Sequence, residues 1–466
     1  MHRFAAAILL WTGTSYAKPA SPSSEVVLLE KVIADELAQT RTPGAAMVVV
    51  KDGAVVYARG FGRASSERSA PVTTATLFRL GSTTKMLTAT AVLSLVADGK
   101  LSLTQPVTRY LPTLGEAFSR VTLQQLLSHS AGLCEATPKI DSRDDDALER
   151  EIAGWAGTQR FYTDPGAQYS YAGPSYYLSG RLLELVTGKP YADVMEQLVF
   201  APLGMKSSTL RPLLALTRPL AQGHVASLDG VQVVRPMVEN VAMYPGGSVF
   251  SCADDLGRFM LAMLAGAPLG KPRVAREFLQ RRFALPTPPP DRGKSFYGFG
   301  TVAYDLAEVP VFEHGGVRRG YGSFIRMIPA KQVGIAVLAN LNGTNLRKSV
   351  ARATHIFAGL DEPRDEPRPP IAPLASELAA VAGEYRQCGL SWRYSVAGDT
   401  LLREFAGEKT VMKRRAPLYY AADDGQDALF LLDAKGQVEY VHSDLVSAKK
   451  QSAPDPGPRS AAGRAP

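Results

Sequence analysis

Hydrophobic residues recur at helical spacing near the start of the chain and in strand-like runs directly after it. A helix is expected over residues 25–41, because five apolar residues fall on one of its faces: Val26, Leu29, Val32, Ile33 and Leu37. The apolar run 45–50, a turn at 51–53 and a return over 54–59 predict an antiparallel hairpin. A helix followed by a hairpin disfavours the strand–helix–strand alternation of a doubly wound domain.

The run from Met86 to Val96 is almost free of charge all round, which predicts a helix buried inside a large domain and ended by Asp98 and Gly99. Ser82 and Lys85 stand at its start, and positions three apart lie on the same side of a helix. A serine needs a base to become a nucleophile, and a lysine is a base only where burial or neighbours keep it neutral. Ser-x-x-Lys alone is a weak signal, but its place at the mouth of a buried helix makes it a candidate catalytic pair.

Capping boxes predict two further helix starts. Thr122 with Gln125 predicts a short helix through residue 127 that ends near His129, and Ser251 with Asp254 predicts a helix through residue 264. His129 is a candidate base, but we favour a structural role in which it ties this helix end to a loop.

A loop rich in tyrosine precedes a helix expected from Pro174 to Gly188. A tyrosine in this loop could carry a proton if a cation such as Lys85 lowered its pKa. The pattern alone does not distinguish Tyr171 from the neighbouring tyrosines.

The second half of the chain reads as strands, then a linker, then shorter strands. Strands are expected over 301–304, 321–328 and 333–340, and a closing helix over 345–358. A proline-rich, charged stretch predicts a stiff linker, and beyond it short alternating runs predict an all-β unit made of hairpins. These runs cover 391–396, 401–405, 410–414, 428–432 and 438–442.

At 466 residues the chain is long enough for two or three folded units. A short basic start, an apolar run and small residues around a cleavage site predict a signal peptide, and with it a periplasmic or secreted protein. The expected organisation is a signal peptide (1–17), a main domain (24–360), a linker (361–374), a small β domain (375–450) and a disordered tail (451–466).

Composition excludes several classes of function. The formal charge of +8 is modest and scattered, and no basic stripe with interleaved aromatics suggests a nucleic-acid partner. Neither the histidines nor the cysteines show metal-ligand spacing, so no metal or other cofactor is expected. The three cysteines allow at most one disulfide; buried thiols are favoured, and a Cys134–Cys252 pair stays open. No stretch is long enough to span a membrane.

With these pieces in order, the chain resembles the serine β-lactamase and penicillin-binding protein superfamily, especially its class C-like branch of D,D-peptidases, D-aminopeptidases and esterases. The matching stretches are 78–85, 126–133, 165–180, 245–259, 297–300 and 314–317. The resemblance implies an α/β (α+β) fold, with an antiparallel sheet flanked by helices, a mostly helical subdomain and a cleft between them. It also implies that the C-terminal β unit is a small lipocalin-like barrel.

The resemblance assigns roles position by position. Ser82 is the expected acylated nucleophile, Lys85 its base partner and Tyr171 the second proton carrier. The backbone N–H groups of Ser82 and Val317 are the expected oxyanion hole. His314, with Gly315 and Gly316, falls at the family's Lys-Thr-Gly element on an edge strand, where substrate is bound.

Two residues depart from the family pattern. Gly173 stands where the family often has an asparagine, so a side-chain amide that could hold Lys85 or a substrate carbonyl is missing. His314 replaces a lysine, and a mostly neutral imidazole is a weaker anchor for a substrate carboxylate. Arg318 and Arg319 either compensate or face water.

These departures favour an esterase or peptidase over an efficient antibiotic-degrading β-lactamase. The leading hypothesis is an exported serine hydrolase that cleaves an ester, a D-amino acid peptide or a lactam through an acyl-enzyme on Ser82. The alternative is a protein that binds wall peptides or penicillin without turnover. An α/β-hydrolase is disfavoured because the sequence has no Gly-x-Ser-x-Gly elbow. The oligomeric state stays open.

Overall fold

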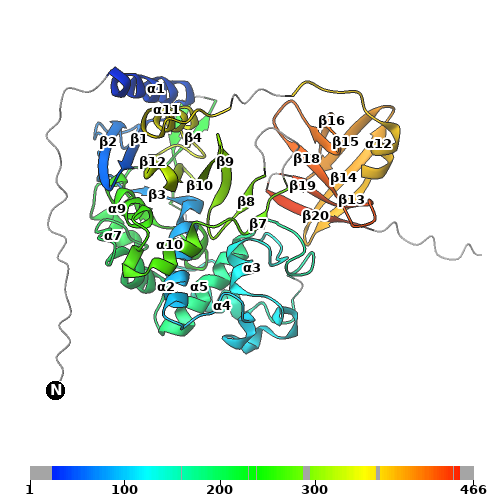
Figure 1. The fold of residues 1–466 in the computed structure, drawn as a ribbon, viewed down its shortest axis with the longest axis horizontal. Coiled ribbons are helices and arrows are strands. Elements are labelled where there is room, and N and C mark those ends of the chain that lie inside the picture. Colours follow the sequence, from blue (N-terminus) through cyan, green and yellow to red (C-terminus); the bar gives the residue numbers. More distant parts are fainter. Residues whose placement is uncertain are drawn as a thin grey trace, which may run out of the picture.

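The structure is a computed structural model that describes residues 24–158, 160–228, 230–237, 239–286, 294–363, 368–443 and 445–451. The expected signal peptide, part of the expected linker and all but the first residue of the expected tail lie outside the described residues. The described chain forms a mixed helix–sheet unit and, beside it, an all-β barrel (Figure 1).

A sheet of eight antiparallel strands runs through the first unit in the order β2-β1-β12-β11-β10-β9-β8-β7. Its strands are β1 (Gly44–Lys51), β2 (Ala54–Gly62), β7 (Phe283–Ala284), β8 (Phe296–Tyr297), β9 (Val302–Leu306), β10 (Val309–Arg318), β11 (Tyr321–Ile328) and β12 (Val333–Ala339). The predicted hairpin is β1–β2, and the three strands predicted in the second half are β9, β11 and β12. The pattern did not predict β7 and β8, which have two residues each, or β10, which has ten.

Both faces of this sheet are covered, which explains why β1 reads as a continuous apolar run rather than an alternating one. Met47 and Val49 pack in the core beneath α1 (Ser24–Thr40) and α11 (Arg347–Ala358), which contact each other. Val48 and Val50 point to the opposite face and the larger core, where α9 (Ala253–Leu264) lies against β1 and β12.

The larger core is built around α2 (Thr84–Ala97), in which every residue from Thr84 to Val96 is buried. The uncharged run in the sequence predicted this helix and its end at Asp98, and both predictions are confirmed. Further helices complete the subdomain: α3 (Leu123–Leu127), α4 (Ala147–Ala153), α5 (Gly173–Thr187), α6 (Tyr191–Met195), α7 (Pro212–Leu216), α8 (Tyr244–Gly247) and α10 (Pro272–Phe278). Two small two-stranded sheets pair β3 (Phe78–Arg79) with β6 (Phe250–Ser251) and β4 (His224–Ser227) with β5 (Gly230–Val233).

Of the two predicted capping boxes, the first is confirmed and the second is wrong. Thr122 and Gln125 form the reciprocal pair at the start of α3. Ser251 instead lies in β6 and hydrogen bonds to Ser208, so the cap of α9 falls on Cys252, whose side chain makes no capping bond. A tertiary pairing has overridden a local signal.

The second unit is a closed barrel of eight strands with one helix, α12 (Ala375–Val381). The strands are β13 (Gly383–Gln387), β14 (Leu390–Ala397), β15 (Thr400–Phe405), β16 (Glu408–Ala416), β17 (Tyr419–Ala421), β18 (Asp427–Leu432), β19 (Val438–Ser443) and β20 (Val446–Lys450). Aromatic side chains fill its interior, with Tyr394 and Phe430 in edge-to-face contact at 4.9 Å. The pattern predicted five of these strands but missed β13, β17, β20 and the helix.

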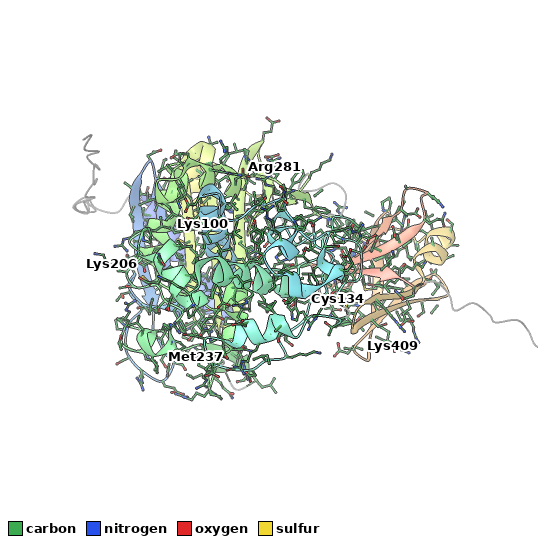
Figure 2. All side chains as sticks on the ribbon, turned by 90° about the horizontal axis from the view of Figure 1, so that it is seen from below. Lys100, Cys134, Lys206, Met237, Arg281 and Lys409 are labelled. Atoms are coloured by element: carbon green, nitrogen blue, oxygen red, sulfur yellow. A yellow bond between two sulfur atoms is a disulfide. The ribbon has the colours of Figure 1, made fainter. Side chains whose placement is uncertain are left out.

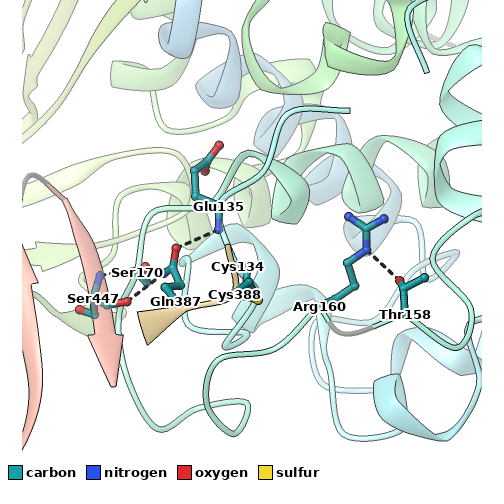
Figure 3. Close-up of a disulfide and its surroundings, with 8 residues drawn as sticks. All are labelled: Cys134, Glu135, Thr158, Arg160, Ser170, Gln387, Cys388 and Ser447. Atoms are coloured by element: carbon teal, nitrogen blue, oxygen red, sulfur yellow. Dashed lines mark hydrogen bonds between the residues drawn. A yellow bond between two sulfur atoms is a disulfide. The ribbon is translucent and has the colours of Figure 1, made fainter. Parts of the chain in front are cut away.

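A disulfide joins the barrel to the helical subdomain. Cys134 is bonded to Cys388, with a Cα–Cα distance of 6.1 Å, and Cys252 is a buried free thiol. The limit of one disulfide is confirmed, but the expectation of buried thiols is wrong for Cys134 and Cys388, and Cys134 does not pair with Cys252. Cys134 lies where the helical subdomain meets the barrel (Figure 2), and Figure 3 shows the bond and its surroundings.

Candidate active site

Ser82 lies in a tight turn between β3 and α2, in the 3-10 segment Gly81–Thr83. Gly81 has a φ of +55°, and a Cβ there would lie 2.5 Å from the backbone of Val317. Glycine is therefore required both for the turn and for the close approach of β10. The turn leaves Ser82 partly exposed at the head of the buried helix.

Lys85 is buried beneath Ser82, with 2% of its surface exposed. Its Nζ lies 3.4 Å from Ser82 Oγ and donates a hydrogen bond of 2.7 Å to the carbonyl oxygen of Gly246. Burial lowers the pKa of Lys85 to about 7, against the opposing negative charge of Glu135. A substantial fraction of this amine is neutral at physiological pH, which is the state that a base needs.

Tyr171 covers the other side of Lys85, whose Nζ lies 4.8 Å from the centre of the Tyr171 ring. The Tyr171 hydroxyl is buried and has no hydrogen-bond partner among the described residues. Burial raises the pKa of Tyr171 well above its usual value. The idea that Lys85 lowers this pKa is therefore wrong, and Tyr171 keeps its proton.

His129 ties the end of α3 to the tyrosine loop, which is the structural role that we favoured. Its Nδ1 accepts a hydrogen bond of 3.1 Å from the Ala172 N–H, and its carbonyl oxygen accepts one of 3.0 Å from Ser170 N–H. Burial lowers the pKa of His129, so the ring is neutral. It also packs on the Tyr171 ring at 4.2 Å and fixes its position.

The segment 314–318 of β10 forms the facing wall. The expectation that this segment lies on an edge strand is wrong, because β10 lies between β9 and β11. The pairing of β10 with β9 ends at Glu313, so residues 314–318 are not paired with β9. A Cβ on Gly316 would lie 2.0 Å from the Leu80 carbonyl oxygen and 2.9 Å from the Thr83 nitrogen. The strand and the Ser82 turn are thus in backbone contact, and the Val317 side chain is 55% exposed, as expected for a residue that contributes its backbone.

His314 lines the cavity, but both its ring nitrogens are bonded within the protein. Nδ1 lies 2.5 Å from the Gly315 carbonyl oxygen, which can only accept, so Nδ1 carries the hydrogen. Nε2 is 2.7 Å from the Tyr297 hydroxyl and accepts its hydrogen. Burial, with a smaller effect from Lys85, lowers the pKa of His314 to about 4, so the site has no cation where the family pattern has lysine.

The side chains of Arg318 and Arg319 lie in different environments. Arg319 is exposed, whereas Arg318 is half-buried, with its Nη1 3.7 Å from the Met243 sulfur. Burial lowers the pKa of Arg318, and the charge of Glu239 opposes this effect. Arg318 is therefore placed beside the site rather than in water.

Glu135 is the group that sequence reasoning missed. Its carboxylate accepts a hydrogen bond of 2.6 Å from the Gly173 N–H and acts electrostatically on Lys85. A Cβ on Gly173 would lie 3.3 Å from Glu135 Oε1 and 2.7 Å from the Tyr177 hydroxyl, so these two side chains fill the space beside Gly173. The only sequence signal was the missing asparagine, which implied space to be filled but not by which residue.

A cavity of about 450 Å³ opens beside Ser82. Ser82, Tyr171, His314, Gly315, Gly316 and Val317 all line it. Leu445, from the turn between β19 and β20, also lines it and brings the barrel into the site. The Leu445 carbonyl oxygen accepts a hydrogen bond of 3.0 Å from the Tyr171 N–H, so the barrel contributes to positioning Tyr171.

Neither a metal cluster nor a membrane-spanning helix occurs in the described ranges. No group of three or more His, Cys, Asp or Glu residues there could hold a metal ion. No helix in the same part of the chain is long and apolar enough to cross a bilayer.

A family model described as Beta-lactamase matches residues 29–360. The chain belongs to the beta-lactamase family. Among its curated relatives, penicillin-binding protein 4 of Amycolatopsis lactamdurans is 29% identical over 74% of this chain and 94% of its own. A D-aminopeptidase of Gluconobacter oxydans is 29% identical over 80% of this chain and 69% of its own. Esterase EstB of Burkholderia gladioli is 31% identical over 51% of this chain and 69% of its own.

Solved structures of other proteins share the fold. The structure of SurE aligns with a TM-score of 0.75 over 92% of this chain and 99% of its own, at 23% identity. A penicillin-binding protein homologue from Pyrococcus abyssi aligns with a TM-score of 0.67 over 91% of this chain and 100% of its own, also at 23% identity. The named relatives support a beta-lactamase-family serine hydrolase.

Proposed function

We propose that this protein is an exported serine hydrolase that cleaves an ester or amide through an acyl-enzyme on Ser82. The observation that carries the proposal is the Ser82–Lys85 pair: a partly exposed hydroxyl 3.4 Å from a buried amine whose pKa burial lowers to about 7. In structures without substrate such distances are often long and shorten in the reacting complex.

Ser82 Oγ attacks the carbonyl carbon while its proton passes to the neutral Nζ of Lys85. The carbonyl oxygen becomes an oxyanion and accepts hydrogen bonds from the N–H groups of Ser82 and Val317. As the tetrahedral intermediate collapses, the leaving group takes the Tyr171 phenol proton, and the Lys85 ammonium restores it. The products of this half-reaction are the free alcohol or amine and the Ser82 ester.

Water then attacks the Ser82 ester. Its proton passes to the Lys85–Tyr171 pair, and the carbonyl oxygen again occupies the same two N–H groups. When the second intermediate collapses, Ser82 recovers a proton and the acid is released. Because Tyr171 stays a phenol, it serves in both halves as a donor that Lys85 recharges, not as the primary base.

The same contacts argue against an efficient β-lactamase of the class C type. A β-lactam carries a carboxylate, and His314 offers neither a positive charge nor a free ring nitrogen to it. Arg318 is half-buried beside Met243 and is not among the residues that line the cavity. We therefore propose esters and peptides, including D-amino acid peptides, as the substrate class.

Export is supported by the Cys134–Cys388 disulfide, because such bonds persist in oxidising compartments such as the periplasm or the extracellular space. The basic and apolar start of the sequence is consistent with a signal peptide. We therefore propose a periplasmic or secreted enzyme.

A short-chain nitrophenyl ester and a fluorophosphonate probe test the proposal together. The wild-type protein is expected to release nitrophenol and to gain the mass of one probe on Ser82, whereas Ser82→Ala does neither. Covalent labelling without turnover would favour a penicillin-recognising binding protein instead. Turnover that survives Ser82→Ala would remove Ser82 from the mechanism.

A further inference from the structure

We propose that Gln387, a residue of the barrel, is a positioning residue for the reaction: its side-chain amide holds the loop that carries Tyr171 and so keeps the phenol ring over Lys85. Gln387 is not among the residues that line the cavity beside Ser82, so it acts through Tyr171 and not on the substrate. The inference rests on the proposed function, because Tyr171 delivers the proton to the leaving group in that mechanism.

The backbone around Tyr171 is held from two sides. On one side, the Ser170 N–H donates a hydrogen bond of 3.0 Å to the His129 carbonyl oxygen, and the Ala172 N–H donates one of 3.1 Å to His129 Nδ1. On the other side, the Tyr171 N–H donates a hydrogen bond of 3.0 Å to the Leu445 carbonyl oxygen of the barrel. A shift of the barrel turn between β19 and β20 therefore moves Tyr171.

Gln387 ties this part of the barrel to the loop. It is the last residue of β13 and has 0% of its surface exposed. Its Nε2 donates a hydrogen bond of 2.7 Å to Ser170 Oγ and one of 2.9 Å to the Ser447 carbonyl oxygen, and its Oε1 accepts one of 3.2 Å from the Glu135 N–H. One amide thus joins the tyrosine loop, the start of β20 and the segment beside Cys134 (Figure 3).

Ser170 and Ser447 complete a buried network with this amide. The Ser447 N–H donates a hydrogen bond of 3.1 Å to Ser170 Oγ, and Ser447 Oγ donates one of 2.7 Å to the Tyr169 carbonyl oxygen. Both serines are buried. Because a buried polar group that loses its partner has no water to replace it, the network is sensitive to the loss of a single member.

Only a carboxamide satisfies both sides of this position. The Glu135 N–H can only donate and the Ser447 carbonyl oxygen can only accept, so residue 387 must present one acceptor and one donor. The same partners fix which end of the amide is oxygen and which is nitrogen. A methionine has a similar unbranched shape but replaces neither bond.

The disulfide and the amide have complementary effects. Cys388 directly follows Gln387 and is bonded to Cys134, which directly precedes Glu135. The covalent bond and the amide therefore join the same two segments at neighbouring positions. The disulfide limits the distance between the barrel and the helical subdomain, whereas the amide sets how the barrel is oriented against the tyrosine loop.

The test compares nitrophenyl butyrate with methyl butyrate, which share an acyl group and differ in the leaving group. Nitrophenolate leaves without a proton, whereas methoxide needs the proton that Tyr171 delivers. We expect Gln387→Met to lower kcat/KM by roughly tenfold to a hundredfold for methyl butyrate and by less than about threefold for nitrophenyl butyrate. Gln437→Met, which changes an exposed barrel glutamine just before β19, is the matched control and should keep both wild-type values.

A double-mutant cycle measures whether Gln387 acts through Tyr171. In Tyr171→Phe the donor is already absent, so adding Gln387→Met should cause no further loss with either ester. Equal losses in the two backgrounds would overturn the inference. A loss in Gln387→Met that is the same for both esters would also overturn it, because a merely structural role lowers both alike. So would a wild type that cleaves only the nitrophenyl ester, since no leaving group then needs a positioned donor.

Labelling of Ser82 separates this inference from the proposed function. A fluorophosphonate loses fluoride, which leaves as an anion, so Gln387→Met should gain one probe on Ser82 at about the wild-type rate. A folded variant that is not labelled has lost more than the position of the donor, which counts against the inference. If the wild type is not labelled and cleaves neither ester, the proposed function itself fails.

Ser170→Ala provides a second variant in case Gln387→Met does not fold. It removes the hydroxyl that accepts from Gln387 Nε2 and the Ser447 N–H, but it leaves the other two bonds of the amide in place. We expect a smaller loss with the same dependence on the leaving group. Wild-type values for both esters in Ser170→Ala would overturn the inference.

Discussion

Replacing Lys85 with methionine should make the protein more stable while abolishing turnover. The pKa of Lys85 falls from 10.5 to about 7 because the amine is buried. At about 1.4 kcal/mol for each tenfold change in proton affinity, keeping this amine protonated inside the protein costs about 5 kcal/mol at low pH. Methionine has a similar shape and no charge, but it leaves the Gly246 carbonyl oxygen without its hydrogen bond, a loss of about 1 kcal/mol. Glu135 also loses the positive charge opposite it, so we expect a net gain of about 1–3 kcal/mol in the free energy of unfolding.

The pH dependence gives this prediction its sign. The pKa of Lys85 is lower in the folded than in the unfolded protein, so between pH 7 and 10.5 the unfolded state binds more protons and stability rises with pH. The destabilisation is complete below pH 7 and has vanished above pH 10.5. The advantage of Lys85→Met over the wild type should therefore be largest near pH 6 and shrink steadily toward pH 10.

Urea unfolding at pH 6, 8 and 10 measures this difference. Tryptophan fluorescence follows it, because Trp155 lies buried in the helical subdomain with 1% exposure. The matched control is Lys100→Met, which removes an exposed lysine just beyond α2 and should show no pH-dependent difference. The reasoning would be refuted if Lys85→Met were less stable than the wild type at every pH. It would also be refuted if the difference in free energy of unfolding between the two proteins were the same at all three pH values. In the wild type the same titration should appear in kcat/KM for a nitrophenyl ester, which is expected to rise with pH around a midpoint near 7.

Three further changes probe other parts of the site. Gly316→Ala should lower activity by roughly a hundredfold or more, because the added Cβ would lie 2.0 Å from a backbone carbonyl oxygen. Gly315→Ala is the control, since its Cβ would make only an ordinary contact at 3.7 Å. Equal activities of the two variants would contradict the close backbone contact at Gly316. Tyr171→Phe should slow turnover by roughly 10²–10⁴-fold. The loss should be larger for a methyl ester than for a nitrophenyl ester, because the nitrophenol leaving group needs no proton. An equal loss for both esters would show that Tyr171 is not the proton donor. Replacing Cys134 and Cys388 with serine should destabilise barrel docking by about 2–4 kcal/mol in urea unfolding, whereas treating the double variant with a reductant should cause no further loss.

The parts of the fold that the sequence predicted are those set by local chemistry. The apolar run in α2 requires burial on every side, whatever the tertiary structure around it. A spacing of three residues on a helix likewise brings Ser82 and Lys85 together independently of the rest of the fold. The β1–β2 hairpin and the capping box at Thr122 likewise depend on residues close in sequence.

The parts that it could not predict depend on residues far apart in the chain. Cys134 and Cys388 are separated by 254 positions, so nothing local distinguishes their pairing from other pairings. Glu135 meets Gly173 only because two loops converge, and Ser251 is drawn from its expected cap into a strand pair. The resemblance assigned roles to residues that match the family pattern, but it assigned none to Glu135, which fills the space left by the departure at Gly173.

The contact of Leu445 with Tyr171 has a consequence for when the enzyme first becomes competent. The nucleophile is translated more than 300 residues before Leu445, whose carbonyl oxygen accepts the Tyr171 N–H and whose side chain forms part of the cavity wall. A nascent chain that has folded only its helix–sheet unit therefore carries the serine and the lysine without the enclosure around them. The cavity is therefore complete only after the ribosome has delivered the barrel, which the disulfide joins to Cys134.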